Sequence, residues 1–128
     1  MTPDQIIEAH IKNNNLDTTK EQMIAEVNAF DKLKNAFVTK VNNCMFLFQV
    51  NGQTALMYII NGGNGVGYVK AIKEFVVNMR KAKISHLQMY VQDTNSAKKL
   101  AESAGAISVD FKKDPKRAVD PYLMTMEI

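Results

Sequence analysis

The first third of the chain carries apolar residues at helical spacing in two separate segments. A threonine cap followed by proline and an acidic residue begins the first segment, and a run of three asparagines ends it. A second threonine cap, completed by Glu21 and Gln22 as a capping box, begins a segment that stays amphipathic to about residue 36. We therefore expect two helices whose apolar faces pack on the core. The boundary residues are Thr2 and Pro3, Asn13 to Asn15, and Thr18 or Thr19.

From residue 37 onward the pattern changes to that of strands. Residues 38–41 are expected to form a short strand. Residues 44–50 are apolar and rich in aromatic side chains, which is typical of a buried strand. Asn51-Gly52 is a strong hairpin signal, and it predicts that residues 54–60 return as the neighbouring strand.

The second half of the chain alternates helices with strands. A glycine-rich segment after residue 60 runs into a helix with apolar residues at helical spacing, among them Val69, Ile72 and Met79. The order ααβββαβαββ predicts a single α+β domain over residues 1–128, built around a mixed sheet. The later elements are a strand over residues 84–92, a helix over 96–104 that ends at Gly105, and strands over 107–111 and 122–128.

Four of the six glycines lie between Gly62 and Gly67, where a strand meets a helix. Small residues at such a junction let backbone N–H groups and the helix N-terminus face a phosphate. A P-loop needs Lys and then Ser or Thr where Tyr68 and Val69 stand, and the dinucleotide fingerprint needs a glycine where Tyr68 or Lys70 stands. The segment is therefore another kind of anion site, or a tight turn that lets the helix pack closely.

Two motifs in this order resemble those of the GNAT N-acetyltransferases. The coenzyme-A loop of that family reads Arg/Gln-x-x-Gly-x-Gly/Ala, and Gly65 and Gly67 match its two small positions, with the apolar Val66 between them. A later block of the family reads Asn-x-x-Ala-x-x-Leu-Tyr-x-x-x-Gly-Phe. The segment from Asn95 to Ala106 is similar to this block, although its alanine falls one place early. The order of elements also resembles that of the family, with the family's first strand either missing or hidden.

The resemblance implies that the chain binds acetyl-CoA. The pantetheine would run along one strand in a splayed gap, and the pyrophosphate would lie on the backbone amides of the glycine loop. Asn95 would face the pantetheine or thioester, and Lys98 or Lys99 would reach the 3′-phosphate; the alternative for these lysines is a solvated helix face. The strand residues are Tyr58, Ile59 and Ile60, and the loop residues are Gly63, Asn64, Gly65, Val66 and Gly67.

Three departures from the family pattern bear on catalysis. Gly62 stands at the Arg/Gln position, and Ala101 stands where the family has its tyrosine acid. No Asp or Glu lies on the strand over 54–60, where a general base would stand. Tyr90 is the first substitute acid to consider, because a phenol is protonated at neutral pH and can donate to a leaving thiolate. Tyr58 and His86 are further candidates, and each of these residues has a purely structural alternative.

Composition narrows the function classes. The chain has 128 residues, 46% apolar and 23% charged, which is a globular balance with enough apolar residues for a core. We expect one core that contains Phe30, Phe46, Phe48 and Val76. A single cysteine, Cys44, excludes an internal disulfide, and two histidines leave little to bind a metal. With no secretory leader or membrane span recognisable, we expect a cytoplasmic protein.

The charge is unevenly placed along the chain. Residues 1–53 carry a net charge of −1 and residues 54–128 carry +4, for a total of +3. The basic excess in the loop over residues 112–121 suggests an acidic partner, while a nucleic-acid duplex usually requires a stronger basic stripe. The basic residues cluster at Arg80, Lys81 and Lys83, at Lys98 and Lys99, and at Lys112, Lys113, Lys116 and Arg117.

Three functions remain open at this point. The first is an acetyl-CoA-dependent N-acyltransferase with an unidentified amine acceptor. The second is a catalytically degenerate GNAT-like protein of a bacteriophage, associated with the virion or directed at the host cytoplasm, that acts by binding another protein. The third, and least favoured, is a nucleic-acid-binding domain.

Overall fold

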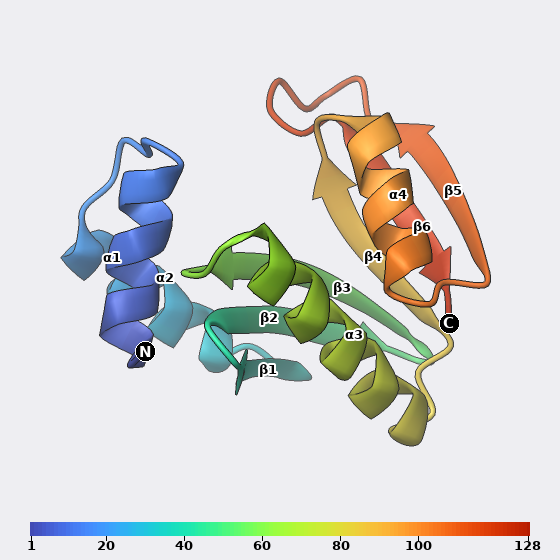
Figure 1. Ribbon diagram of the computed structural model, residues 1–128, viewed down its shortest axis with the longest axis horizontal. Helices are drawn as coiled ribbons and strands as arrows, with labels where there is room; N and C mark the ends of the chain where they lie inside the picture. Colours follow the sequence, from blue (N-terminus) through green and yellow to red (C-terminus); the bar gives the residue numbers. More distant parts are fainter.

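The computed structural model describes all residues from 1 to 128, and its elements follow the expected order ααβββαβαββ (Figure 1). The helices are α1 (Pro3–Asn13), α2 (Lys20–Asp31), α3 (Gly65–Lys81) and α4 (Thr94–Ser103). The strands are β1 (Ala36–Val41), β2 (Cys44–Asn51), β3 (Thr54–Asn61), β4 (His86–Val91), β5 (Ser108–Lys113) and β6 (Tyr122–Glu127). No helix has the length and apolar character needed to cross a bilayer.

The first two helices begin at the caps that the sequence indicates. Thr2 and Thr19 each accept a backbone N–H from the third helical residue, and that residue, Gln5 or Gln22, reaches back to the backbone N–H of the cap. The choice left open between Thr18 and Thr19 therefore falls on Thr19. Each box satisfies two N–H groups that would otherwise lack partners at a helix start.

The six strands form one sheet in the order β1-β2-β3-β4-β6-β5. Neighbouring strands are antiparallel except β3 and β4, which are parallel and joined by α3. Gly52, with a φ of 63°, takes the left-handed conformation in the turn between β2 and β3, as the Asn-Gly signal predicts. The fold is thus α+β with a mixed, mostly antiparallel sheet.

Strands β3 and β4 part soon after they meet. Only residues 54–56 of β3 pair with residues 86–88 of β4, although β3 continues to Asn61 and β4 to Val91. Figure 1 shows the two strands diverging toward the end where α3 and α4 begin. The sheet is therefore split on one side of its centre, and the split creates a gap lined by both strands.

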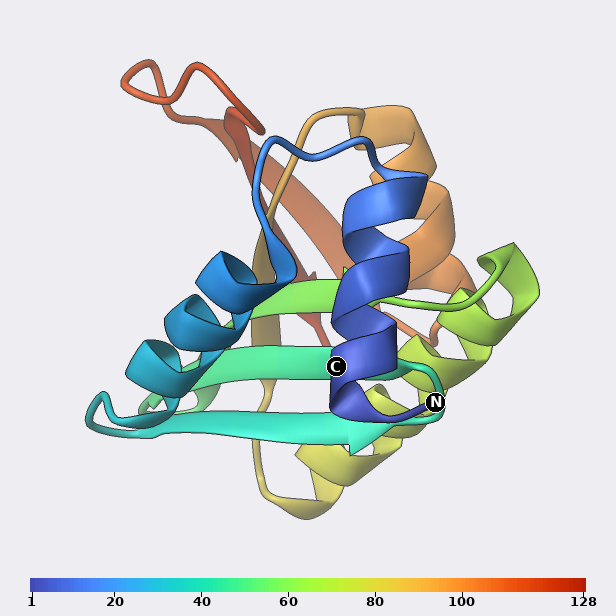
Figure 2. The ribbon, with the colours of Figure 1, turned by 90° about the vertical axis from the view of Figure 1, so that its left-hand side faces the viewer.

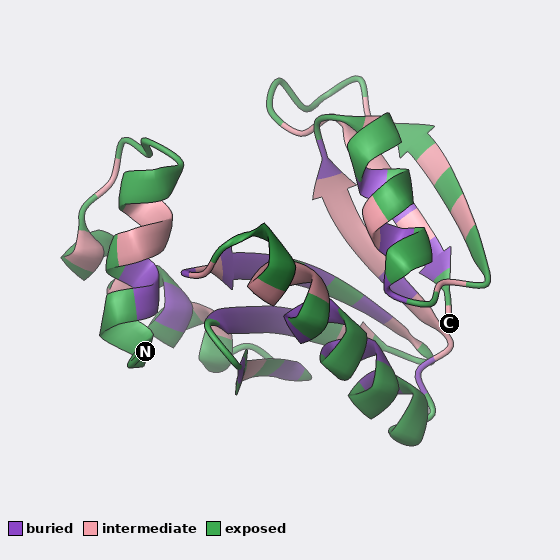
Figure 3. Ribbon diagram, viewed as in Figure 1, coloured by how far each residue is buried: buried purple, intermediate pink, exposed green.

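Helices cover both faces of the sheet. Helices α3 and α4 lie on one face, and α1 and α2 lie on the other, over the half formed by β1, β2 and β3 (Figures 1 and 2). A core of 20 buried residues fills the first interface, and seven buried residues fill the second. Strand β2 serves both, because alternate side chains such as Phe46 and Leu47 point to opposite faces. It is buried along most of its length (Figure 3).

The expected single core is therefore wrong for one of its four residues. Phe46, Phe48 and Val76 lie together in the larger core, where the Phe46 and Phe75 rings stack with centroids 4.2 Å apart. Phe30 packs instead against the smaller core beneath α1 and α2. The reason is that α2 lies on the face of the sheet opposite α3, which periodicity along the chain does not determine.

One member of the basic clusters has a specific structural role. Arg80, in the last turn of α3, donates from Nε to the carbonyl oxygen of Ile128 (2.7 Å) and from Nη2 to that of Gly105 (2.6 Å). The guanidinium thus joins the end of α3 to the segments that follow α4 and β6. Because those segments flank β5 and β6, Arg80 ties the two halves of the sheet together.

Candidate functional site

A hollow of about 390 Å³ lies where β3 and β4 diverge, and we call it the β3–β4 cleft. Three tyrosines line it: Tyr58 from β3, Tyr68 from the first turn of α3 and Tyr90 from β4. Its other lining residues are His10, Asn14, Leu16, Ile59, Met89, Val91, Gln92, Asp93, Ser96, Ala97, Leu100 and Asp120. The cleft thus gathers residues from the α1 region, β3, α3, β4, α4 and the β5–β6 loop.

A second hollow of about 190 Å³ adjoins the cleft, and we call it the side hollow. The two hollows share four residues, Tyr58, Met89, Tyr90 and Asp120, and they therefore meet between β3 and β4. The remaining lining residues of the side hollow are Phe30, Leu47, Gln49, Leu56, Met57 and Arg117. A molecule in one hollow would touch the same tyrosines as a molecule in the other.

The glycine loop ends in the N-terminus of α3, close to the cleft. Asn64 caps the helix, and its side chain accepts the Gly67 N–H (2.9 Å), while Asn61 Oδ1 accepts the Gly63 N–H (2.9 Å). The amides of Asn64, Gly65 and Val66 donate no hydrogen bond within the protein. A Cβ added at Gly65 would meet no atom within 4 Å, so this stretch of backbone is open to an approaching molecule.

Gly62, at the Arg/Gln position of the family motif, lies against α1. A Cβ at this position would lie 2.9 Å from the Cα of Ile6 and 3.2 Å from the carbonyl oxygen of Asn43. Both neighbours are backbone atoms that cannot move without shifting α1 or the β1–β2 turn. The missing long side chain therefore has a structural cause, which is the close packing of the end of β3 on α1.

Helix α4 presents other residues to the cleft than the family block indicates. Asp93 caps the helix and accepts from the backbone N–H and hydroxyl of Ser96, which together lower the pKa of its carboxyl. Ser96 lines the cleft, whereas Asn95 is exposed and is not part of its lining. Ala101 is buried in the larger core, at 1% exposure, so the position of the family tyrosine does not face the cleft here. Lys98 and Lys99 are exposed on α4.

The strand residues of the implied site divide between the two faces. Ile60 is buried in the smaller core under α1, so its side chain is not available to the cleft, while Tyr58 and Ile59 line it. Burial, followed by the charges of Asp120 and Glu26, raises the pKa of Tyr58. Burial raises the pKa of Tyr68 to about 12. Both phenols therefore stay protonated at neutral pH.

His10 is a cleft residue that the sequence pattern did not single out. Its Nδ1 accepts the backbone N–H of Asn61 at 3.2 Å, and its ring meets that of Tyr58 edge-on at 6.4 Å between centroids. A backbone N–H can only donate, so the neutral ring carries its proton on Nε2. Burial lowers the pKa of His10. By contrast His86, a sequence candidate, bonds to the Ser85 hydroxyl and does not line the cleft.

The loop between β5 and β6 also contributes residues that sequence spacing could not identify. Arg117 lies 3.7 Å above the centre of the Tyr90 ring, and its Nε donates to the carbonyl oxygen of Asp120 (3.2 Å). The Asp120 N–H donates to Gln92 Oε1 (3.3 Å), which holds the loop against the end of β4. The loop therefore closes one wall of the side hollow. The charge of the loop was visible in the sequence, but charge alone does not tell which way a side chain points.

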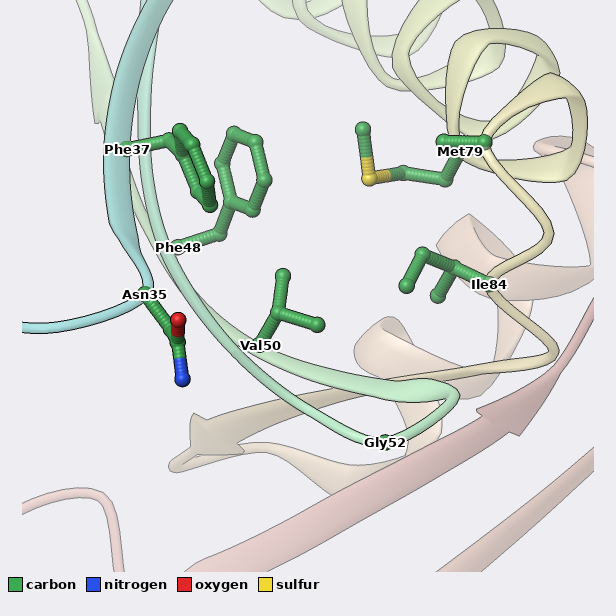
Figure 4. A pocket seen from close by; sticks show the side chains of 8 residues that line it. Asn35, Phe37, Phe48, Val50, Gly52, Met79 and Ile84 are labelled. Carbon is green, nitrogen blue, oxygen red and sulfur yellow. The ribbon is translucent and has the colours of Figure 1, made fainter.

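A third hollow, of about 470 Å³, lies at the far end of the sheet between β1–β2 and the end of α3 (Figure 4). Phe37, Phe48, Met79 and Ile84 point into it, and Asn35 supplies the only polar side chain. It contains no group that can transfer a proton or hold a charge. The β3–β4 cleft, by contrast, is lined by phenols, an imidazole and carboxylates.

The parallel β3–β4 pair that splays open, with α3 crossing between the two strands, defines the GNAT N-acetyltransferase fold. Three solved structures share it. A chimera of the spermidine N-acetyltransferase from Vibrio cholerae gives a TM-score of 0.62 at 14% identity, covering 100% of this chain and 93% of that one. A ribosomal-protein alanine N-acetyltransferase from Escherichia coli gives 0.53 at 15% identity, covering 98% and 86%. An IAA acetyltransferase from Bacillus cereus gives 0.51 at 15% identity, covering 100% and 93%.

These likenesses establish the fold of the chain. No protein-family model matches the sequence, and no curated protein is significantly similar to it. Support for an activity therefore comes from the residues of the cleft.

Proposed function

We propose that the chain is an acyl-CoA-dependent N-acyltransferase whose β3–β4 cleft holds the thioester arm of the acyl donor. One observation carries this proposal. The backbone N–H groups of Asn64, Gly65 and Val66 donate no hydrogen bond within the protein, and they lie at the start of α3 beside the splayed strands. Backbone N–H groups at a helix N-terminus suit a pyrophosphate. The part of β3 that β4 leaves unpaired suits an extended amide-bearing chain, which can pair with it as an added strand.

The surroundings of the loop fit such a donor. Gly65 leaves open space where a phosphate would approach, and Tyr68, in the same helical turn, lines the cleft that the pantetheine would enter. Lys98 and Lys99 are exposed on α4 and would meet the 3′-phosphate. Asn95 would act at the pantetheine only if its side chain turned toward the cleft.

The reaction assigned to this site is nucleophilic acyl transfer. The amine nitrogen of the acceptor forms a bond to the thioester carbonyl carbon, the carbon–sulfur bond breaks, and coenzyme A leaves as a thiolate that takes up one proton. An acceptor that arrives as an ammonium ion releases two protons in all, one of which ends on the thiol and the other in the solvent. In a site without a strong base, most of the rate enhancement comes from holding the amine and the thioester in the right geometry.

Tyr90 and Tyr58 are the phenols placed to protonate the thiolate. Both line the cleft and the side hollow, so both lie where donor and acceptor would meet. Tyr90 is the first choice, because the Arg117 guanidinium over its ring stabilises negative charge that develops on the phenol oxygen. Proton donation of this kind contributes about 10²–10⁴ in rate.

The proposal is tested by titrating acetyl-CoA into the protein and then following thiol release with a panel of amines. We expect binding and turnover, with turnover lowered in Tyr90→Phe at unchanged acetyl-CoA affinity. Tyr122→Phe, on β6 and outside both hollows, is the matched control. Failure to bind acetyl-CoA would overturn the proposal and favour a binding protein that keeps the fold without the reaction.

A further inference from the structure

We infer that the side hollow takes a free α-amino acid with an apolar side chain as the acyl acceptor. This inference rests on the proposed function and specifies its acceptor. The hollow contains one cation and one anion that are not paired with each other, and its remaining walls are mainly apolar. That combination complements a zwitterion better than it complements a simple amine.

Arg117 is the cationic group of the side hollow. Its Nε donates to the Asp120 carbonyl oxygen, while its two Nη atoms have no hydrogen-bond partner in the protein. The central guanidinium carbon lies 3.7 Å from the centre of the Tyr90 ring, and this contact holds the side chain over the ring although the residue is exposed. A guanidinium fork with both Nη groups free matches the two oxygens of a carboxylate.

Asp120 is the anionic group, and it lines the side hollow from the same β5–β6 loop as Arg117. Burial and then the negative charge of Asp120 raise the pKa of the Tyr58 phenol on β3, whereas the Arg117 guanidinium lies over the Tyr90 ring on β4. The backbone of Asp120 is held by Gln92 and Arg117 in a left-handed conformation with φ 47°. The carboxylate oxygens accept no hydrogen bond, so they remain free for an ammonium group.

The two charges do not form an ion pair. The single ion pair of the chain joins Lys20 and Glu8, neither of which lines this hollow. An acceptor with an ammonium group alone would satisfy Asp120 and place a second cation beside Arg117, which is unfavourable. An α-amino acid brings a carboxylate on the neighbouring atom and satisfies both groups. Phe30, Leu47 and Leu56 then leave an apolar wall for its side chain.

The experiment compares three probes by isothermal titration at saturating coenzyme A, which cannot transfer an acyl group. The probes are L-leucine, L-leucinamide, which lacks the carboxylate, and 4-methylpentanoate, which lacks the amine. At about pH 6.5 both amines are protonated. We expect L-leucine to bind at least about tenfold more tightly than either analogue. Arg117→Gln should remove the preference over L-leucinamide, and Asp120→Asn should remove the preference over 4-methylpentanoate.

Two surface variants serve as matched controls. Lys116→Gln removes a positive charge from the same loop, and Asp110→Asn removes a negative charge from β5, and neither residue lines the hollow. Both should retain the preference of the parent. Equal affinity of the parent for L-leucine and L-leucinamide, or a preference that survives Arg117→Gln, would overturn the inference. Acetyl-CoA titration of the same proteins reports separately on the proposed function, so the failure of one is told apart from the failure of the other.

Discussion

The backbone N–H of Asn61 donates to Nδ1 of His10 at 3.2 Å, and this bond joins the last residue of β3 to α1. It spans 51 positions in sequence and lies at the edge of the β3–β4 cleft. A protonated ring would present an N–H to another N–H at this point, so the contact requires the neutral imidazole. The fold thereby couples the protonation state of a side chain to the position of the first helix.

Stability should therefore decrease as the pH falls below about 6.5. Burial lowers the pKa of His10 in the fold, while in the unfolded chain the imidazole has its ordinary pKa of about 6.5. Between these two pKa values the unfolded chain binds more protons, so the free energy of unfolding falls with decreasing pH and is at its full value above about pH 6.5. Urea unfolding at several pH values between about 8 and 5 measures the effect.

His10→Gln supplies the comparison, because its amide oxygen can still accept the Asn61 N–H but does not titrate. This variant should show a smaller loss of stability between the two ends of the pH range. His86→Gln removes the other histidine and is the control that separates the contribution of His10 from that of His86. A loss in His10→Gln as large as that of the parent would contradict the assignment.

Gly65→Asp should abolish acetyl-CoA binding without harming the fold. The new side chain enters open space, and a carboxylate in the first turn of α3 is favourable for the helix dipole, so the Tm should be unchanged or higher. The same carboxylate would repel a pyrophosphate and weaken binding by at least about tenfold. Val77→Asp adds an equal charge to the exposed face of α3 and should bind acetyl-CoA like the parent. Unchanged binding in Gly65→Asp would show that the phosphates lie elsewhere.

Truncation of the stacked aromatic pair should be costly. Phe46 is fully buried and stacks on Phe75, so Phe46→Ala should lower the free energy of unfolding by about 3–5 kcal/mol. Phe37, on the neighbouring strand, is 51% exposed, and Phe37→Ala should cost only about 1 kcal/mol. Urea melts of both variants test the assigned strand register. Equal losses would mean that the register is shifted by one residue, because such a shift exchanges the two faces.

Arg80→Gln should destabilise the fold by about 1–3 kcal/mol, because it removes the two bonds to the Gly105 and Ile128 carbonyls. Lys81→Gln removes the same charge from the adjacent exposed position and should cost far less. Chemical denaturation measures both. If the two variants are equally stable, the bonds of Arg80 contribute nothing beyond its charge.

Local signals in the sequence predicted the elements well. Thr2 as a cap, Thr19 as one of two candidate caps, and the Asn51-Gly52 turn each depend on residues within three or four positions, and the structure confirms them. The glycine loop was located correctly at a helix start for the same reason. What these signals share is that one short segment determines its own geometry.

The remaining parts of the site depend on contacts between distant segments. His10 is defined by Asn61, and Asp120 by Gln92, so no pattern near either residue could reveal its place. The assignment of Phe30 to the larger core failed because hydrophobic spacing determines which side of α2 is buried but not which face of the sheet it covers. A motif alignment assigned Ala101 to the position of the family tyrosine. The alignment does not determine how α4 is rotated about its axis, and this rotation decides which side chains reach the cleft.

The contact between Gly62 and α1 restricts the order in which this site can be altered. An arginine or glutamine introduced at position 62 would strike the backbone of Ile6 before it reached any phosphate. An engineer who wishes to strengthen donor binding must therefore either redesign the docking of α1 first or begin from α4, where Lys98 and Lys99 are free of such neighbours. In this chain the packing of the first helix therefore restricts which residues the glycine loop can contain, although the loop lies more than 50 residues further along the sequence.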